Sequence, residues 1–336
     1  MGIAIHSLVT GGAGFIGSHL VDRLAADGDR VTVIDNLETG NAANLDEALG
    51  SGRVTLHQAD IANQAAISRL FNNVDRVFHL AGLADIIPSI ENHAAYHHAN
   101  VDGTMAVMEA ARLAGTDRLV YAASSSCYGL PDAFPTTESA EVRPQYPYAL
   151  TKFLGEQIAL HWGQVYGIET NSLRLFNVYG PRHRTSGAYG AVFGVFLAQR
   201  LAGQPLTIVG DGNQTRDFTY VTDVVDAFVK ASSGRVAGEI MNVGSGGTYS
   251  VNTLAEIIGG PTTSLPKRPG EPDCTFADID KIQRLLEWSP QVSFEVGVGK
   301  VLGVIDEWAD APVWTPEGIA DATRAWFEHL DSRARI

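Results

Sequence analysis

The sequence predicts an α/β protein with a doubly wound parallel sheet and a smaller α/β domain at its C-terminal end. Three observations support this prediction. Short apolar stretches alternate with helix-like stretches through the first half, and glycines cluster directly after the first apolar stretch. Beyond residue 180, glycine and proline punctuate shorter and less regular elements. We therefore place a sheet domain at 1–175 and a smaller domain at 176–336, allowing some later segments to return to the first.

The composition is that of a packed globular protein, with 45% hydrophobic and 18% charged residues among 336. The formal net charge of −14 argues against a nucleic acid or an anionic membrane as partner. The two cysteines fit a reducing compartment, and no cysteine or histidine cluster has the spacing of a metal site. We expect no signal peptide and no membrane span, so we predict a cytoplasmic protein without a bound metal.

The first predicted strand, at 3–10, leads into a turn with Gly11, Gly14 and Gly17. A tight turn, the close approach of a pyrophosphate to bare backbone, and the close packing of helix on strand would each require one glycine. The helix that follows, at 15–27, offers free N–H groups to phosphates at its N-terminus. The glycines alone would also suit any other tight strand-to-helix turn.

Asp35 ends the second predicted strand, 31–34, and stands 18 residues after Gly17. A carboxylate at about this distance binds the adenosine ribose of NAD and repels the extra phosphate of NADP. Strand, glycines, helix, second strand and carboxylate occur here in the required order. We therefore predict a Rossmann-type unit that binds NAD.

The later elements continue the alternation of strand and helix, which implies right-handed crossovers and a sheet covered by helices on both faces. Ligands of such sheets bind at the carboxyl ends of the strands. The two long helices either pair with a second copy of the chain across a two-fold axis or only cover the sheet. The predicted strands are 54–57, 76–80, 118–122 and 172–175, and the predicted helices are 65–71, 93–114, 148–166 and 315–330.

Tyr148 and Lys152 lie one helical turn apart on one face of the 148–166 helix. A phenol has a pKa of about 10, but a nearby ammonium group and the positive nicotinamide of an oxidised cofactor would lower that pKa. Tyr148 would then serve as general base toward a sugar hydroxyl. Ser124, at the end of a predicted strand, would share a hydrogen bond with the reacting oxygen. The alternatives are a solvated helix face and a polar turn.

Together these motifs resemble the extended short-chain dehydrogenase/reductase family, and within it the NAD-dependent nucleotide-sugar epimerases and dehydratases. The resemblance covers about residues 5–310. The blocks that carry it are 10–17, 35–36, 60–61, 79–82, 100–104, 124–129, 147–152, 174–181, 210–218 and 268–272.

The resemblance implies that Ser124, Tyr148 and Lys152 form a catalytic triad and that NAD is the cofactor. Asp60 and Ile61 would hold the adenine. The full set of cofactor-binding residues that it implies is Gly11, Gly14, Phe15, Ile16, Gly17, Asp35, Asn36, Asp60, Ile61, Leu80, Ala81, Gly82, Asn100, Tyr148 and Lys152.

The resemblance also implies a site for a nucleotide sugar. Asn177 would contact the substrate diphosphate, and Arg216 and Arg268 would grip it, which suits guanidinium groups because they bind phosphate bidentately. Asp273 or Glu271 would reach the nucleotide ribose. The implied substrate-binding residues are Ser125, Ser126, Asn177, Arg184, Arg216, Arg268, Asp273 and Thr275.

Departures from the family pattern narrow the chemistry. Ser125 and Ser126 stand where the 4,6-dehydratases carry Asp and Glu, and the uronate decarboxylases carry Glu at the second position. The missing acid argues against both reactions. Thr275 is smaller than the tyrosine of some members, so a bulky C2 substituent such as N-acetyl would fit. Arg184 either contacts a C6 carboxylate, as in uronate epimerases, or lies on a solvated or diphosphate-facing loop.

We predict an NAD-dependent 4-epimerase of a nucleotide sugar, a UDP-hexose, with N-acetylated and uronate sugars left open. The cofactor would stay bound and be regenerated in each turnover. A net oxidoreductase acting on a nucleotide 4-keto sugar is the alternative, and a non-catalytic nucleotide-binding protein is a further one. The resemblance implies a homodimer, formed through the helices at 93–114 and 148–166.

Overall fold

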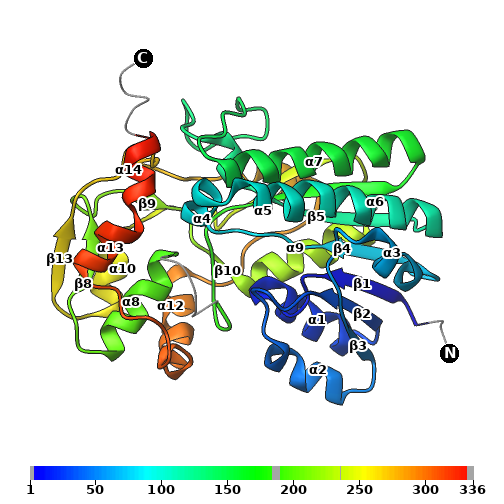
Figure 1. Ribbon diagram of the computed structural model, residues 1–336, viewed down its shortest axis with the longest axis horizontal. Helices are drawn as coiled ribbons and strands as arrows, with labels where there is room; N and C mark the ends of the chain where they lie inside the picture. Colours follow the sequence, from blue (N-terminus) through cyan, green and yellow to red (C-terminus); the bar gives the residue numbers. More distant parts are fainter. Residues whose placement is uncertain (1–3, 184–189, 235, 331–336) are drawn as a thin grey trace.

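A computed structural model describes residues 4–183, 190–234 and 236–330 of the chain. At its centre is a seven-stranded sheet built from β1 (His6–Thr10), β2 (Arg30–Asp35), β3 (Val54–Gln58), β4 (Arg76–His79), β5 (Arg118–Ser124), β6 (Glu169–Leu175) and β11 (Ile240–Val243). All neighbouring strands run parallel, in the order β11-β6-β5-β4-β1-β2-β3 (Figure 1). The order reverses between β1 and β4, as in Rossmann-type sheets, and the predicted fold class is confirmed.

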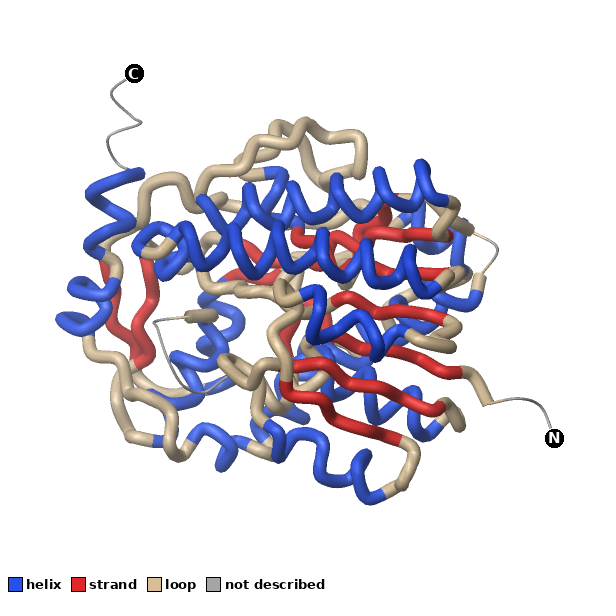
Figure 2. The backbone as a smooth tube through the Cα atoms, turned by 45° about the vertical axis from the view of Figure 1, so that its right-hand side comes forward, coloured by secondary structure: helices blue, strands red, loops and turns tan. Residues whose placement is uncertain are grey.

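Helices cover both faces of this sheet (Figure 2). One face carries α1 (Phe15–Ala26), α2 (Asp46–Gly50), α9 (Val221–Ser233) and α11 (Asp280–Leu286); the other carries α3 (Gln64–Ile67), α6 (Gly103–Ala114) and α7 (Pro147–Tyr166). Successive strand residues enter opposite cores: Val77 packs on the α6 side and Phe78 on the α1 side. This burial on both faces explains why the strands read as continuous apolar runs.

A second, smaller layer follows. Its helices are α8 (Val192–Leu201), α10 (Val251–Ile258), α12 (Phe294–Leu302), α13 (Pro316–Ala322) and α14 (Arg324–Leu330), and its strand pairs are β8 (Leu206–Val209) with β13 (Thr262–Leu265), β7 (Val178–Tyr179) with β10 (Thr219–Tyr220), and β9 (Thr215–Arg216) with β12 (Tyr249–Ser250). Its core is aromatic: the ring centroids of Tyr179 and Phe193 lie 4.5 Å apart, and those of Phe218 and Phe294 lie 5.2 Å apart.

The chain crosses between the two layers more than once. Although α9 and β11 come after residue 175, they pack on and extend the first sheet, and β11 pairs with β6. Figure 1 shows the second layer at the carboxyl ends of the sheet strands, with the N-terminus at the far side. The cleft for a ligand is therefore formed where the two layers meet.

Three predicted helices are interrupted. The helix expected at 65–71 consists of α3 and a 3-10 turn at Ser68–Phe71. The helix expected at 93–114 consists of α5 (His93–His97), a π-helical turn at His98–Asp102, and α6. The helix expected at 315–330 is divided into α13 and α14 at Thr323, whose hydroxyl donates to the carbonyl of Ile319 at 2.8 Å. The remaining short elements are α4 (Ile86–Glu91) and the 3-10 turns Ala42–Leu45, Ser125–Tyr128 and Ile305–Trp308.

Among the helices described, none carries an apolar stretch that would span a bilayer.

Candidate active site

The turn between β1 and α1 depends on two glycines for its shape. Gly11 has a φ of +70°, and a Cβ on it would lie 2.7 Å from the backbone nitrogen of Ala81. A Cβ on Gly17 would collide with the carbonyl oxygen of Gly11. These positions bring α1 and the turn after β4 close to the end of β1, so no larger residue fits at either one.

Gly14 differs from its two neighbours in the motif. A Cβ there would meet only the carbonyl oxygen of Gly11, at 3.2 Å, so packing within the protein does not require a glycine. Gly14 is the N-cap of α1 and provides no side-chain cap. Backbone N–H groups and the positive end of a twelve-residue helix therefore face a gap without side chains, which fits the pyrophosphate of NAD.

Asp35 ends β2 beside this turn. Its carboxylate accepts the N–H of Ala13 at 3.0 Å and that of Leu37 at 2.8 Å, and the residue is 6% exposed. Burial raises the pKa of Asp35, while these two N–H groups lower it. The carboxylate therefore stabilises the glycine turn, and it lies at the edge where an adenosine ribose would bind. Next to it, Asn36 is exposed and accepts the N–H of Glu38.

Asp60 and Ile61 lie after β3, near the same edge of the sheet. The Asp60 side chain is half exposed, accepts the N–H of Ala62 at 2.9 Å, and lies 3.6 Å from the His98 ring. Ile61 is buried against Gly103, at the start of α6. An apolar surface with an adjacent carboxylate is suited to hold a purine ring.

Asn100 connects the turn after β4 to the catalytic helix. Its Oδ1 accepts the N–H of Leu83 at 2.8 Å, and its Nδ2 donates to the carbonyl of Leu83 and to Thr151 Oγ1, each at 3.0 Å. The π-helical turn places Asn100 at this junction, and π turns are frequent at functional sites. The turn Leu80–Gly82 is thereby fixed against α7, and Ala81 adds an N–H bond to Thr10 Oγ1 at 3.2 Å.

Ser124 and Tyr148 meet at the carboxyl end of β5. Ser124 ends the strand and caps the 3-10 turn that follows, while Tyr148 lies in the first turn of α7. A hydrogen bond from Ser124 lowers the pKa of Tyr148, but burial is the larger effect and raises it; the charge of Asp85 raises it further. The lowering that the sequence predicted is therefore reversed in this structure by desolvation of the phenol.

Lys152 is buried one turn further along α7, with 7% of the residue exposed. Burial lowers the pKa of its ammonium group to about 8, and the charge of Glu156 opposes this shift. The Nζ lies 4.6 Å from the centroid of the Tyr121 ring. Glu156 in turn forms a buried ion pair with Arg174 at 2.6 Å, so the charge behind the helix is balanced.

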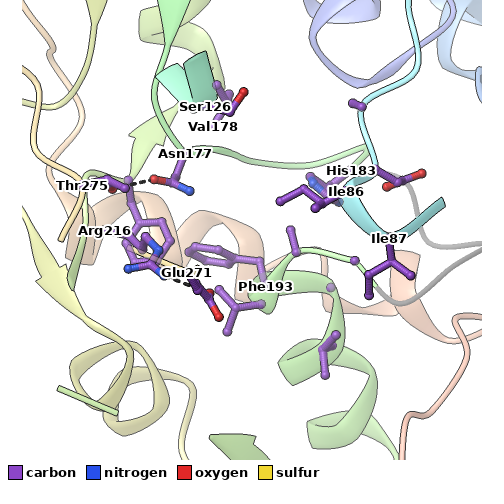
Figure 3. Close-up of a pocket in the computed structure, with 18 of the residues that line it drawn as sticks. Ile86, Ile87, Ser126, Asn177, Val178, His183, Phe193, Arg216, Glu271 and Thr275 are labelled. Atoms are coloured by element: carbon purple, nitrogen blue, oxygen red, sulfur yellow. Dashed lines mark hydrogen bonds and ion pairs between the residues drawn. The ribbon is translucent and has the colours of Figure 1, made fainter. Parts of the chain in front are cut away.

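A cavity of about 530 Å³ opens between the sheet edge and the second layer (Figure 3). Its wall combines hydroxyl and charged groups with many apolar side chains, among them Ile86, Ile87 and Phe193. Of the predicted catalytic residues, Lys152 is not among the described residues that line this cavity. The predicted catalytic and substrate-binding residues that do line it are Ser124, Ser125, Ser126, Tyr148, Asn177, Arg216, Arg268 and Thr275. Residues from separate segments of the chain are thus brought together, as expected of a binding site.

Two arginines of the cavity share one carboxylate. Arg216 Nη2 lies 2.9 Å from Glu271 Oε1, and Arg268 Nη1 lies 3.8 Å from Glu271 Oε2. Figure 3 shows Arg216 and Glu271 directed at each other inside the cavity. Both guanidinium groups are largely buried, so their charge is weakly screened by solvent. The cluster carries a net positive charge and presents the forked donors that phosphate binding requires.

Asn177 and Thr275 form the adjoining wall. The hydroxyl of Thr275 donates to Asn177 Oδ1 at 2.8 Å and accepts the backbone N–H of Asp217 at 3.0 Å (Figure 3). Asp217 is buried and bonded to Ser245 and Ala277. The amide nitrogen of Asn177 therefore points toward the cavity (Figure 3), where it is an uncharged hydrogen-bond donor.

One predicted substrate residue, Asp273, is not among the described residues that line the cavity. The Asp273 side chain is 75% exposed and lies 2.5 Å from Lys267 Nζ, whereas its alternative, Glu271, lines the cavity. Position therefore favours Glu271, because Asp273 is engaged on the outer side of the loop. Arg184 lies outside the described residues. Its neighbour Arg182 is paired with Asp22 on α1 at 2.6 Å.

Further residues of the cavity were not predicted, among them Asp85, Tyr146 and Trp326. The rings of Tyr146 and Tyr148 are parallel within 5°, with centroids 6.4 Å apart. Trp326 belongs to the terminal helix, far from every motif in the sequence. The one available signal was that an aromatic residue at 146 directly precedes the Pro147 that opens α7.

The family model for NAD-dependent epimerases and dehydratases matches residues 7–244. This chain belongs to that family. The match includes the glycine turn, Asp35 and the whole Ser124, Tyr148 and Lys152 set, and it confirms the family that the motifs indicated. The family is NAD dependent, and the gap at Gly14 is consistent with that cofactor.

Individual relatives support the same family assignment. The chain is 38% identical over 306 residues to the UDP-glucose 4-epimerase of Mycolicibacterium smegmatis, covering 89% of this chain and 97% of the relative. It is similar to the solved UDP-N-acetylglucosamine 4-epimerase of Methanobrevibacter ruminantium, at 31% identity and a TM-score of 0.85 over 91% of this chain and 98% of that one. The UDP-glucuronic acid 4-epimerase of Bacillus cereus, solved with UDP-glucuronic acid and NAD, has 32% identity and a TM-score of 0.84, covering 90% of this chain and 99% of that one.

Proposed function

We propose that this chain is an NAD-dependent nucleotide-sugar 4-epimerase whose substrate is a UDP-hexose. The observation that carries the proposal is the single cavity that joins Ser124 and Tyr148 to the Arg216, Glu271 and Arg268 cluster. One end provides a base for a sugar hydroxyl, and the other provides cations for a diphosphate. The relatives named as UDP-sugar 4-epimerases support the same reaction.

Tyr148 takes the proton of the C4 hydroxyl and later returns it. The chemistry that NAD would supply at this site is reversible hydride transfer at C4, by way of a 4-keto sugar. Ser124 holds the reacting oxygen by a hydrogen bond and lowers the pKa of Tyr148. Lys152, at the inner side of α7, orients the nicotinamide ribose and places a positive charge behind the phenol. Tyr148 and Lys152 therefore lie where the cofactor and the reacting sugar meet.

The NAD site is formed by the backbone of the glycine turn and by Asp35. The N–H groups at the start of α1 hold the pyrophosphate, and Asp35 with Asn36 holds the adenosine ribose. Asp60 and Ile61 hold the adenine, and the turn Leu80–Gly82, fixed by Asn100, supports the nicotinamide half. Phe15 and Ile16 separate this site from the substrate cavity, which they line.

The substrate diphosphate is bound by Arg216 and Arg268, with Asn177 as a neutral donor, and Glu271 reaches the uridine ribose. The sugar lies against Ser124, Ser125 and Ser126. Among the described residues, the arginine and lysine side chains that line the cavity are Arg216 and Arg268, which gather at Glu271 and not at the serines (Figure 3). The small Thr275 admits an N-acetyl group, and a uronate stays open because Arg184, the predicted contact for a C6 carboxylate, lies outside the described residues.

The active form is a homodimer built through α6 and α7. These adjacent helices expose large apolar side chains on the outside of the molecule: Met105 and Leu113 on α6, and Leu150 and Val165 on α7. Leu113 is 62% exposed and Val165 is 54% exposed. Large apolar side chains exposed on two adjacent helices are suited to an association site. A cytoplasmic location stays a prediction; Cys127 and Cys274 are both free thiols, which suits a reducing compartment.

The test is a panel of UDP-glucose, UDP-N-acetylglucosamine and UDP-glucuronate, incubated with the purified chain without added NAD or reductant. We expect at least one sugar to equilibrate with its C4 epimer, and we expect NAD to be released when the protein is denatured. Turnover that requires stoichiometric NAD(P)H would show a net oxidoreductase instead. Release of CO2 from UDP-glucuronate, or loss of water from any sugar, would contradict the proposal in favour of decarboxylation or dehydration.

A further inference from the structure

The cavity holds a second phenol beside the one assigned to catalysis. Tyr146 lines the cavity two residues before Tyr148, yet the motif block that carries the family resemblance begins only at Pro147. The rings of Tyr146 and Tyr148 are parallel within 5°, with their centroids 6.4 Å apart, and both residues are partly exposed. Two phenols are therefore presented at the reactive end, and the shared motifs account for one of them.

Tyr146 stands at a position of the helix where tyrosine is not a preferred residue. It is the N-cap of α7, with an extended backbone at φ −147° and ψ 163°, and its side chain caps no N–H group of the helix. Ser, Thr, Asp and Asn are preferred at an N-cap because their short side chains accept such an N–H. Departures from local preference are expected at functional sites. The Tyr146 side chain gives the helix no cap and lies in the cavity wall instead.

The hydroxyl of Tyr146 makes no hydrogen bond to any residue that the structure describes. A buried or partly buried phenol normally has a hydrogen-bond partner, so this hydroxyl is suited to a ligand. Burial raises the pKa of Tyr146; the charges of Tyr148 and Glu271 raise it further, and that of Arg216 opposes them. The phenol therefore stays neutral at neutral pH, and its hydroxyl is able both to donate and to accept.

Tyr146 lies between the reactive end and the diphosphate end of the cavity. Tyr148 is on one side; on the other, the Trp326 ring is 5.9 Å from Tyr146, and the guanidinium carbon of Arg268 is 5.8 Å from the centre of that indole. Trp326 is 3% exposed and donates to the carbonyl of Pro269 at 2.7 Å, so it supports the Tyr146 ring from behind. A hexose with its C4 hydroxyl at Tyr148 and its diphosphate at Arg268 therefore passes the Tyr146 hydroxyl.

We propose that Tyr146 is a sugar-binding residue whose hydroxyl bonds a hydroxyl of the hexose beside C4. The proposal rests on the proposed function, because it assumes a hexose between Tyr148 and Arg268. The sugar must present each of its faces in turn, so different sugar hydroxyls come to lie at the same wall. A phenolic hydroxyl rotates and is both donor and acceptor, so it is able to bond either one. Its contribution belongs to the sugar and not to UDP.

The test compares full-length Tyr146→Phe with wild type. Phenylalanine keeps the ring that packs on Trp326 and removes only the hydroxyl. Calorimetry gives the Kd of UDP and of the panel sugar that the wild type binds most tightly. Tyr179→Phe is the matched control: it also removes a phenolic hydroxyl, which donates to the carbonyl of Phe294 at 3.3 Å, and Tyr179 is not among the described residues that line the cavity.

We expect Tyr146→Phe to raise the Kd of the UDP-sugar about fivefold, as the loss of one neutral hydrogen bond predicts, with the Kd of UDP unchanged within about twofold. The melting temperature should stay within about 2 °C of wild type, because the packing of the ring is kept. Tyr179→Phe should leave both Kd values within about twofold. Equal weakening of UDP and the UDP-sugar, no weakening of either, or the same loss in Tyr179→Phe overturns the proposal.

Tyr146→Ser is a second variant. Serine supplies a hydroxyl that is able to cap α7, but this hydroxyl is too short to reach the sugar. The Kd of the UDP-sugar should rise at least as much as in Tyr146→Phe while the Kd of UDP is kept. If Tyr146→Phe does not fold, Tyr146→Ser decides: a selective rise supports the proposal, and a wild-type Kd for the UDP-sugar overturns it.

These readouts separate the two proposals. If no panel sugar is inverted at C4 but the Kd of the UDP-sugar rises selectively as described, the proposed function fails and the assignment of Tyr146 stands. If inversion is observed and the selective rise is absent, the function stands and the role of Tyr146 fails.

Discussion

The edge proposed to bind the cofactor and the edge proposed to bind the substrate present different groups to an anion. At the cofactor edge the groups are backbone N–H donors at the start of α1, exposed because Gly14 has no side chain. At the substrate edge they are two guanidinium groups held by a carboxylate. The first arrangement is rigid, since parallel strands and close helix packing define it. The second depends on ion pairs among loops, which a ligand is able to replace.

The largest expected effect tests the rigid edge, by comparing Gly17→Ala with Gly14→Ala. The methyl group added by Gly17→Ala would strike backbone that has nowhere to move, which costs a few kcal/mol. We expect the melting temperature of this variant to fall by about 10 °C and bound NAD to be lost. Gly14→Ala meets only one atom at 3.2 Å, so it should keep the melting temperature within about 2 °C while losing NAD.

Melting curves and NAD content per chain measure both variants. If Gly14→Ala melts as low as Gly17→Ala, the motif glycines serve packing alone, and the distinction between the two edges fails at this point.

Tyr148→Phe tests the residue where the two edges meet. Removal of the phenolic oxygen should lower kcat by about 10³-fold, because general base catalysis is lost. NAD content and the Kd of UDP should stay within about twofold of wild type, since phenylalanine keeps the ring of Tyr148 and removes only its hydroxyl. A Tyr148→Phe variant with more than about a tenth of wild-type kcat would place the base elsewhere.

Arg216 tests the substrate edge, where a ligand is able to replace the existing ion pairs. Arg216→Ala should raise the KM of the UDP-sugar about 30-fold, which corresponds to the loss of charge-assisted bonds to phosphate, and should leave NAD content and melting temperature unchanged. Arg216→Lys keeps the charge but not the forked geometry and should recover only part of this loss. Steady-state kinetics at two salt concentrations measures the change in KM. An equal loss of NAD in Arg216→Ala would show that the two edges are not independent.

Ser124→Ala should produce a smaller, pH-dependent change. The Ser124 hydrogen bond lowers the pKa of Tyr148, so its removal raises that pKa and moves the ascending limb of the pH–activity profile to higher pH. Activity near pH 7 should fall about tenfold and partly recover as the pH increases. Above about pH 8 the activity of both proteins should decline, because Lys152 then loses its charge.

Ser126→Ala, which removes the hydroxyl bonded to Ser124 at 2.8 Å, is the matched control and should leave the profile in place. An unshifted profile in Ser124→Ala would exclude the role assigned to this hydroxyl.

The smallest effect on each active site is expected at the outer helices. Leu113→Asp combined with Val165→Asp places charges in the proposed dimer surface and should give a monomer by light scattering. NAD content should not change, and turnover per chain should stay within about twofold, because neither residue reaches the cavity. A wild-type chain that is already monomeric would contradict the dimer.

The sequence was sufficient for those parts of the site that short spacings determine. Gly11, Gly14, Gly17 and Asp35 belong to one βαβ unit, so their order along the chain reports their order in space, and the predicted fold and family are confirmed. Tyr148 and Lys152 share a helix for the same reason. The 4-epimerase reading followed from what is missing at Ser125 and Ser126, and the relatives agree with it.

The remaining parts of the site depend on how segments that are distant in the sequence pack together. Glu271 and Asp273 are two residues apart and chemically equivalent in sequence, yet one lines the cavity and the other is bonded to Lys267 in solvent. Trp326 and Tyr146 meet although more than half of the chain separates them, and no periodicity indicates such a contact. The pKa of Tyr148 depends on how much water the surrounding layers remove, which a motif does not record.

Glu271 has a consequence for reversibility. In the resting protein it serves as a substitute anion that keeps both guanidinium groups separated and aimed before any nucleotide arrives. In the proposed function, an entering diphosphate would replace Glu271 as the counter-charge, so its net affinity would be smaller than two unneutralised arginines would give. An isomerase interconverts two molecules of identical charge and must let either one depart. A site with its own internal counterion is suited to that exchange, because departure of the product restores a pairing and leaves no bare cations behind.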